Sequence, residues 1–227
     1  MIGIIGAMSI EIDGLVAIMD ERKTISCGIY NYEVGKIFGK EVVVCRCGIG
    51  KVFSSTATAL MIEKFAPVAI INIGVAGGAK PLCQGDIVVS KRTVQHDYDG
   101  TADGLKMGQV HGFDSQYFNC DENLVNAISK VIDEFGYSYI VGTVATGDCF
   151  VSDNAKSSFI AKTFDANAFD MESGAINQVC NVQNVPFVAL RAISDNGDDS
   201  AMKSFYEFVT EAATRSISII SKYIQNL

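Results

Sequence analysis

Short runs of apolar, mostly β-branched residues recur along the chain. They comprise Ile2–Ile5, Val42–Cys45, Val68–Ile73, Ile87–Val89, Tyr139–Val144 and Phe187–Ile193. Within each run the apolar residues are continuous and do not alternate with polar ones, which is typical of strands covered on both faces in a largely parallel sheet. The pattern therefore predicts an interior sheet whose strands are joined by helical crossovers.

Three of the remaining segments carry apolar residues at helical spacing. They are Ser54–Phe65, Asp121–Phe135 and Ala201–Ile224, and the last is long enough to close the fold. Strands that alternate with helices indicate the α/β class. No Pro/Ser-rich linker, low-complexity tract or internal repeat interrupts the 227 residues, so we expect a single domain over residues 1–227.

Glycines and carboxylates gather directly after the predicted strands. The chain reads GAMSIE after the first run, GIGK after the second, GVAGG after the third, and GDCF and SDNG after the last two. In open α/β sheets, ligands bind in the crevice at the carboxyl ends of the strands. The sequence thus predicts that these loops converge on a small-molecule site.

Composition and charge narrow the range of partners. Aliphatic and aromatic residues make up 48% of the chain and charged residues 19%, which excludes a disordered protein. The net charge of −8, without a cluster of Lys or Arg, argues against nucleic acid. The longest uncharged run is too short to cross a bilayer, and no export signal marks the N-terminus, so we expect no membrane partner and a cytoplasmic location.

The sequence lacks the usual motifs for metals, nucleotides and covalent catalysis. Seven cysteines without a C-x-x-C pair argue against disulfides and structural zinc, and only His96 and His111 could supply imidazole ligands. There is no G-x-G-x-x-G fingerprint and no G-x-S-x-G elbow. Gly50-Lys51 does not belong to a P-loop, because that motif requires Gly at position 45 and Ser or Thr at position 52, where the chain has Cys and Val. We expect the cysteines mostly in the core and chemistry that needs no metal.

Three carboxylates remain at strand-to-loop transitions: Glu11, Glu172 and Asp195. Each has a structural explanation, because Glu11 and Glu172 would favour helix N-termini, the latter before a helix that begins near Ser173, and Asp195 could form a turn. If all three share one crevice, they would suit acid–base chemistry on a polar neutral substrate. A hydrolase is the class of enzyme that fits them best.

Seven motifs occur in the order and spacing of one family, from Ile2 to about Phe208: GIIGAMSIEI, CGIGKV, NIGVAGGA, GDIVVS, TGDCFV, DMESGAI and VPFVALRAISD. On these motifs the chain resembles the 5′-methylthioadenosine/S-adenosylhomocysteine nucleosidases of the purine nucleoside phosphorylase/uridine phosphorylase superfamily. The resemblance implies a three-layer α/β/α sandwich around a twisted, mostly parallel mixed sheet. It also implies hydrolysis, without a cofactor, of the bond between adenine and ribose in methylthioadenosine, S-adenosylhomocysteine and 5′-deoxyadenosine, which serves methionine salvage.

The resemblance assigns roles to matching residues. Glu11 matches the carboxylate that activates the attacking water, Glu172 the residue that holds the ribose hydroxyls, and Asp195 the acid that serves adenine, either directly or by relaying a proton to the purine ring. Seven further positions match substrate-binding residues: Met8, Ile49, Gly77, Phe150, Val151, Met171 and Phe205. Phe205 has an alternative explanation as a core residue at helical spacing with Phe208.

Two residues are expected to support the carboxylates. Ser194 precedes Asp195, and Arg191 lies four residues before Asp195, where strand alternation places it on the same face. We favour a structural pairing of Arg191 with a buried acid over a direct role. Asp170 has no matched role and is interpreted as structural.

The resemblance further implies a homodimer in which a loop at about residues 96–113 helps a neighbouring subunit to close the pocket around the 5′ substituent. Asp103 stands where an aromatic residue is expected, and Val75 where many relatives carry Ser. Three other functions remain open: a 6-amino-6-deoxyfutalosine nucleosidase of menaquinone synthesis, a phosphate-dependent purine nucleoside phosphorylase, and a non-enzymatic nucleoside-binding protein. In each case the expected partner is a small nucleoside.

Overall fold

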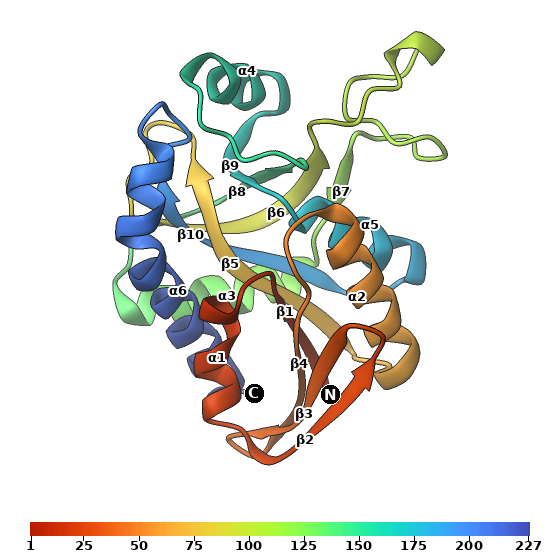
Figure 1. Cartoon of the computed structure of the whole chain (residues 1–227), viewed down its shortest axis with the longest axis vertical. Coiled ribbons are helices and arrows are strands. Elements are labelled where there is room, and N and C mark those ends of the chain that lie inside the picture. The colour runs from red at the N-terminus through yellow and green to blue at the C-terminus, as the bar shows by residue number, and fades with distance from the viewer.

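The computed structural model describes all 227 residues, with helices on both sides of a ten-stranded mixed sheet (Figure 1). The strands are β1 (Ile2–Gly6), β2 (Asp20–Cys27), β3 (Tyr30–Ile37), β4 (Lys40–Arg46), β5 (Ala69–Gly78), β6 (Ile87–Gln95), β7 (Tyr117–Asn119), β8 (Tyr139–Thr146), β9 (Ala166–Asp170) and β10 (Phe187–Asp195). Each of the six predicted runs lies in a strand, apart from Val68, which precedes β5. The helices are α1 (Ser9–Ala17), α2 (Lys51–Phe65), α3 (Glu122–Phe135), α4 (Asn154–Phe164), α5 (Ser173–Gln183) and α6 (Ala201–Gln225).

The strands at the centre of the sheet pair in parallel. β1 lies between β4 and β5, and β10 pairs with β5, all in parallel, as do β6 with β8 and β8 with β9. β10 also pairs with β6, and β9 with β5, both antiparallel, so that β5, β10, β6, β8 and β9 form a closed ring of strands. This closure brings together the carboxyl ends of strands that are far apart in sequence.

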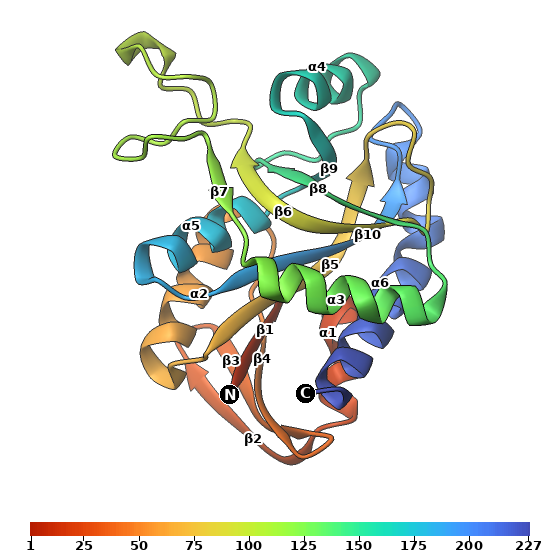
Figure 2. The ribbon, with the colours of Figure 1, turned by 180° about the vertical axis from the view of Figure 1, so that it is seen from behind.

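The helices form two outer layers. α6 packs against α1 and α3, while α2 packs against α5 on the other side of the sheet (Figures 1 and 2). α4 covers β8 and β9 near the top of the view. The expected three-layer α/β/α arrangement is confirmed.

Local sequence explains where α3 begins and ends. At the start of α3, the Asp121 carboxylate accepts a hydrogen bond from the Leu124 N–H at 2.9 Å, and Gly136 ends the helix with a φ of 68°, a conformation that glycine adopts without a Cβ clash. The buried face in between carries Ile128 and Ile132. The predicted segment is therefore correct, with Asp121 as its cap.

The apolar pattern misses elements that contain few apolar residues. β2 reads DERKTISC and all of it but the last residue is exposed, yet it is a strand because it pairs antiparallel with β3. The helix starts expected near Glu11 and Ser173 correspond to α1 and α5, whereas α4 is absent from the prediction. β9 is absent as well, although it is largely buried between β8 and β5, because its five residues ANAFD form no apolar run.

All seven cysteines are free, and four of them are buried: Cys45, Cys47, Cys120 and Cys180. This confirms the expectation that most of them are core residues. No helix of the structure combines the length and the hydropathy that a bilayer crossing requires.

Candidate functional site

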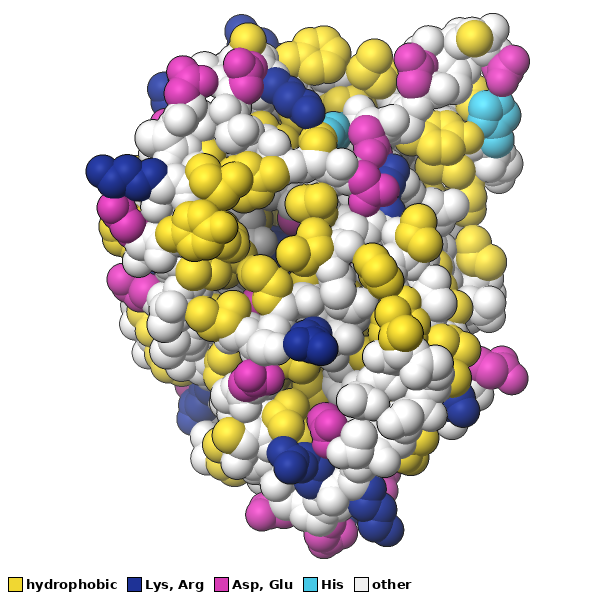
Figure 3. Space-filling model, viewed as in Figure 1, with side chains coloured by type: hydrophobic (Ala, Val, Ile, Leu, Met, Phe, Trp, Pro, Cys, Tyr) yellow, Lys and Arg dark blue, Asp and Glu magenta, His cyan; other side chains and the backbone are white.

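A cavity of about 460 Å³ lies at the carboxyl ends of β1, β5, β9 and β10, next to the start of α6. In the space-filling view, hydrophobic side chains surround a hollow in the middle of this face (Figure 3). Every predicted site residue except Arg191 lines this cavity: Met8, Glu11, Ile49, Gly77, Phe150, Val151, Met171, Glu172, Ser194, Asp195 and Phe205. The loops that follow the strands therefore converge as the sequence predicts.

Glu11 lies in the first turn of α1, and its carboxylate faces the cavity. One carboxylate oxygen, Oε2, accepts hydrogen bonds from the N–H groups of Ala7 (2.7 Å) and Met8 (2.9 Å), and Oε1 accepts one from Val75 (3.1 Å). Burial raises the pKa of the Glu11 carboxyl above its ordinary value, against the opposing effects of the Arg191 charge and of these N–H donors. Glu11 both organises the helix start and presents a carboxyl that holds a proton more readily than usual.

Gly74 on β5 leaves the room that Glu11 occupies. A Cβ at Gly74 would lie 2.5 Å from Glu11 Oε1 and 3.2 Å from a guanidinium nitrogen of Arg191. Any other residue would displace the carboxylate. Gly74, the first glycine of the NIGVAGGA motif, is therefore required for steric reasons.

Glu172 is the residue that precedes α5, but its side chain does not cap that helix. Instead, Oε1 accepts a hydrogen bond from the Gly50 N–H at 2.8 Å, across the cavity wall. The residue is 7% exposed, and burial together with the Asp170 charge raises the pKa of its carboxyl to about 8. Capping of α5 falls to Asp170, whose Oδ2 accepts from the Ser173 N–H at 3.1 Å.

Asp195 ends β10 and is 1% exposed. Its Oδ1 accepts from the Gly197 N–H and its Oδ2 from the Ser194 hydroxyl, both at 2.9 Å. Burial raises the pKa of Asp195, although both donors oppose the shift. Asp195 therefore forms the predicted turn and at the same time places a buried carboxyl in the cavity, supported by Ser194 as expected.

Arg191 forms a buried ion pair with Asp170. Its Nη2 and Nε lie 2.8 and 2.9 Å from Asp170 Oδ2, and Nη2 also contacts the Asn72 side chain. Arg191 thus pairs with a buried acid as expected, and Asp170, interpreted as structural, also lines the cavity. The argument from strand alternation is wrong, however, because a β-bulge between Ile193 and Asp195 interrupts the period.

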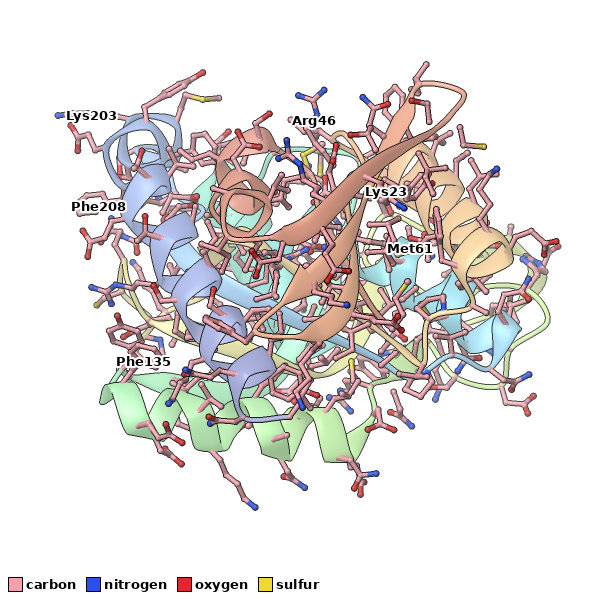
Figure 4. The ribbon with its side chains drawn as sticks, turned by 90° about the horizontal axis from the view of Figure 1, so that it is seen from below. Lys23, Arg46, Met61, Phe135, Lys203 and Phe208 are labelled. Carbon is pink, nitrogen blue, oxygen red and sulfur yellow. The ribbon has the colours of Figure 1, made fainter.

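Aromatic residues form the outer wall of the cavity. Phe150 and Phe205 meet edge to face with ring centroids 5.8 Å apart, and Tyr206 packs in the same way against Phe205. Phe208 projects outward from α6 and is 37% exposed (Figure 4). Phe205 thus belongs to the cavity and does not share a core position with Phe208.

The cavity contains residues that the sequence did not reveal. Met202 and Tyr206 lie within one turn of Phe205 on α6, and Phe169 lies two residues before Met171, so helical and strand periodicity around predicted residues is the signal that was available. Cys149, beside Phe150, lines the cavity as well. Most of these additions are apolar.

The segment 96–113 stays outside the cavity of its own chain. No residue of this loop lines the cavity, and the loop extends away from the body of the fold at the upper right of Figure 1. Asp103 pairs with His111 at 3.0 Å near the tip, and the Tyr98 hydroxyl also contacts His111. The chain's own loop therefore does not close its own pocket.

The cavity offers carboxyl groups, backbone N–H donors and apolar surface. No group of three or more His, Cys, Asp or Glu side chains is arranged to hold a metal ion. Burial raises the pKa of all three carboxyls, so each holds a proton more readily than an ordinary carboxyl, and the apolar walls suit a flat, uncharged ligand.

Comparisons with known proteins agree with this geometry. The model of the phosphorylase superfamily matches residues 1–225. The 5′-methylthioadenosine/S-adenosylhomocysteine nucleosidase of Shewanella frigidimarina is 42% identical over 230 residues, covering 100% of this chain and 99% of the relative. The corresponding nucleosidase of Neisseria meningitidis, solved in complex with methylthio-immucillin-A, has a TM-score of 0.96 at 37% identity and coverages of 100% and 99%. Futalosine hydrolase of Helicobacter pylori has a TM-score of 0.95 at 32% identity, with coverages of 100% and 97%.

Proposed function

Because the chain belongs to the 5′-methylthioadenosine/S-adenosylhomocysteine nucleosidases of the phosphorylase superfamily, we propose that it hydrolyses the N-glycosidic bond of these two nucleosides. The products are adenine and the 5′-substituted ribose, and 5′-deoxyadenosine is a further substrate of the same class. The observation that carries the proposal is the convergence of Glu11, Glu172 and Asp195 on one cavity.

The proposed reaction uses the carboxyls in different roles. Glu11 takes a proton from a water molecule, whose oxygen forms the new bond to C1′ of the ribose. The electron pair of the breaking C1′–N9 bond goes to adenine, and a proton delivered through Asp195 to the purine ring makes adenine a better leaving group. The carboxylate of Glu11 also stabilises the positive charge that develops on the ribose. The raised pKa of Asp195 supports its part as a proton donor.

Glu172 is the proposed ligand of the ribose hydroxyls. One of its oxygens is held by the Gly50 N–H, so the other remains available to the sugar. In this proposal Met8 and Met171 flank the ribose, Phe150 stacks on adenine and the Val151 backbone meets the base. All four residues line the cavity, which supports the assignment.

A phosphorylase reaction has little support from the cationic groups near the cavity. Arg191 is committed to Asp170 and Asn72 and does not line the cavity. Arg46, labelled in Figure 4, donates a hydrogen bond to the Ser9 hydroxyl at 2.9 Å and is exposed. Water is therefore the proposed nucleophile, not phosphate.

A second substrate deserves the same test. The likeness to futalosine hydrolase of Helicobacter pylori is nearly as close as that to the nucleosidases, which supports 6-amino-6-deoxyfutalosine as an alternative nucleoside. In the loop proposed to meet the 5′ substituent, Asp103 stands where an aromatic residue is expected. This difference affects the choice among nucleosides with different 5′ groups.

The decisive measurement is adenine release from methylthioadenosine, S-adenosylhomocysteine and 6-amino-6-deoxyfutalosine, each with and without phosphate. We expect phosphate-independent turnover of the first two. Turnover that strictly requires phosphate would replace the proposal by a phosphorylase. Binding without turnover would replace it by a nucleoside-binding protein.

We also propose that the protein acts as a homodimer in the cytoplasm. Ile49, Val52 and Phe53 form an apolar surface at the start of α2, with 53, 76 and 47% of each residue exposed, and a second copy would cover it. The loop 96–113 would then reach the partner's cavity. Seven free thiols suit a reducing compartment.

Light scattering coupled to size exclusion tests the dimer. We expect twice the chain mass for the wild type and a shift toward monomer for Val52→Lys. Phe38→Lys, at an exposed turn on the opposite end of the sheet, is the matched control and should leave the mass unchanged. A wild type that is monomeric at micromolar concentration would contradict the proposal.

A further inference from the structure

Lys51, Asp97 and Asp148 form a closed ring of contacts beside the cavity. The Lys51 ammonium lies 2.7 Å from Asp97 Oδ1, the Asp148 N–H donates to Asp97 Oδ2 at 2.9 Å, and the Lys51 N–H donates to Asp148 Oδ1 at 2.7 Å. The three residues belong to the loops or helix starts that follow β4, β6 and β8. None of them lines the cavity, so none is accounted for by the proposed chemistry.

Gly50 connects this ring to the cavity. Its N–H donates the one hydrogen bond that the protein gives to the Glu172 carboxylate, at 2.8 Å. On its other side, a Cβ at Gly50 would lie 2.9 Å from Asp148 Oδ1, and the φ of 100° favours glycine. Gly50 is therefore held between Asp148 in the ring and Glu172 in the cavity.

We propose that the ring of Lys51, Asp97 and Asp148 positions Glu172 by fixing the direction of the Gly50 N–H. With one oxygen held in this way, the carboxylate presents the other to the ribose hydroxyls. The inference rests on the proposed function, because it takes Glu172 as the group that binds the sugar. The three ring residues are positioning residues, and none of them lines the cavity of its own chain.

The electrostatics of the ring suit this role. Burial raises the pKa of the Asp97 carboxyl, but the hydrogen bonds from Lys51 and the Asp148 N–H outweigh it and leave the pKa below its ordinary value. The ion pair is therefore formed at neutral pH. The Lys51 and Asp97 side chains remain 20 and 28% exposed, and ion pairs with this access to water contribute little to global stability. Their contribution to geometry can thus be separated from a contribution to folding.

Ligands with and without ribose hydroxyls distinguish positioning from simple bracing of the loops. A brace would affect adenine and nucleosides alike, because the loop after β8 that carries Asp148 also carries Phe150 and Val151, the proposed contacts of the base. Positioning of Glu172 affects only ligands whose hydroxyls it binds. The informative set is methylthioadenosine, its 2′,3′-dideoxy analogue and adenine.

The variants are Asp97→Asn and Lys51→Met, with Asp165→Asn as the matched control. Asp165 pairs with Arg92 at 3.1 Å, and neither residue contacts the ring. Lys51→Met keeps the backbone N–H that binds Asp148, so it tests the ion pair even where Asp97→Asn folds poorly. Thermal unfolding of each protein records its folded state.

Both ring variants should raise the KM for methylthioadenosine about 5- to 20-fold, with a smaller change in kcat. Inhibition by adenine and binding of the dideoxy analogue should stay within about twofold of the wild type, as should all parameters of the control. A wild-type KM in both variants, or an equal loss for adenine and the dideoxy analogue, would overturn the positioning role. Failure of the wild type to release adenine would instead overturn the proposed function.

Discussion

At the scale of single residues, the environment of the three cavity carboxyls opposes their ionisation. Burial raises the pKa values of Glu11, Glu172 and Asp195, while backbone N–H groups and the Ser194 hydroxyl limit the shifts. An ordinary carboxyl is almost fully ionised at neutral pH and is a poor proton donor. Raised pKa values are what a hydrolase needs if carboxyls are to act as acid and base at the same pH.

Asp195→Asn tests the proton donor. Asparagine keeps the shape and can accept from Gly197 or Ser194, but it has no proton to pass to the purine. We expect kcat to fall by about 10²- to 10⁴-fold with unfolding temperature unchanged or raised. The rate of adenine release at saturating substrate measures kcat, and thermal denaturation measures the unfolding temperature. Wild-type turnover in this variant would remove Asp195 from the mechanism.

Glu172→Gln tests the cost of burying the charge. The pKa of Glu172 rises from an ordinary 4.5 to about 8 in the fold, so the folded state binds the proton more tightly than the unfolded chain. Burial of the Glu172 carboxyl therefore does not lower the free energy of unfolding below about pH 4.5. The loss of stability from burying its charge grows as the pH rises from about 4.5 to about 8. Glutamine never ionises, yet it can still accept from Gly50. We expect the free energy of unfolding of the variant to exceed that of the wild type by about 1–3 kcal/mol at pH 8.5 and by little at pH 4.5.

Thermal unfolding at both pH values measures this difference. Glu63→Gln, at an exposed position on α2, is the control and should show no pH-dependent gain. An equal shift of unfolding temperature at the two pH values would contradict the raised pKa of Glu172. The same variant should also bind nucleosides weakly, so that stability and function oppose each other at this residue.

At the scale of elements, strands were predictable where a long run of residues is buried and mostly apolar. The runs in β1, β5 and β10 contain only Asn72 and Arg191 as long polar residues, so composition marks them, whereas the short buried strand β9 was missed. β2 is polar and exposed, and only its hydrogen bonds to β3 make it a strand, which no local pattern records. The bulge in β10 is likewise a property of pairing with β5, and it explains why alternation failed between Arg191 and Asp195.

The cavity was predictable for a different reason. Its carboxylates and glycines follow strands directly, and the carboxyl ends of strands must meet at one edge of the sheet. Met202 and Tyr206 lie instead on the first turns of α6, whose approach to the cavity depends on the packing of that helix on α1 and α3. Ring members such as Asp97 and Lys51 are 46 residues apart and meet only in the fold.

Asp170→Asn tests the connection between β8, β9, β10 and α5. The Asp170 carboxylate accepts from Thr146, Ser173 and Arg191, and both partners of the ion pair are almost fully buried. Removal of its charge deprives the buried Arg191 guanidinium of its ion-pair partner. We expect a loss of about 3–5 kcal/mol in the free energy of unfolding.

Urea denaturation measures that loss. Asp165→Asn removes an exposed carboxylate from its pair with Arg92 and should cost at most about 1 kcal/mol. If the two variants lose the same free energy, Asp170 and Arg191 are not the buried connection that their burial indicates. A pure loss of activity without loss of stability would point to a direct role in the cavity.

At the scale of the whole molecule, each chain has a cavity that its own loop leaves open. Apolar side chains border the hollow on the surface, and the 96–113 loop extends away from it (Figures 1 and 3). In the proposed dimer, each cavity would be built from one chain's carboxyls and the other chain's loop. Catalytic and closing functions would then be separable between two chains.

Mixing two inactive variants tests this arrangement. The first is Asp195→Asn, which lacks the proton donor but has an intact loop. The second replaces the loop tip, residues 101–105, by two glycines and keeps all three carboxyls. Each homodimer should have little activity, but a heterodimer contains one cavity with intact carboxyls and an intact partner loop.

After unfolding and refolding as an equal mixture, about half the chains are in heterodimers, and one of the two cavities in each heterodimer is complete. The mixture should therefore recover about a quarter of wild-type activity. Recovery no greater than the average of the two variants would mean that each chain closes its own cavity. Full activity of the loop variant alone would mean that the loop is not needed for turnover.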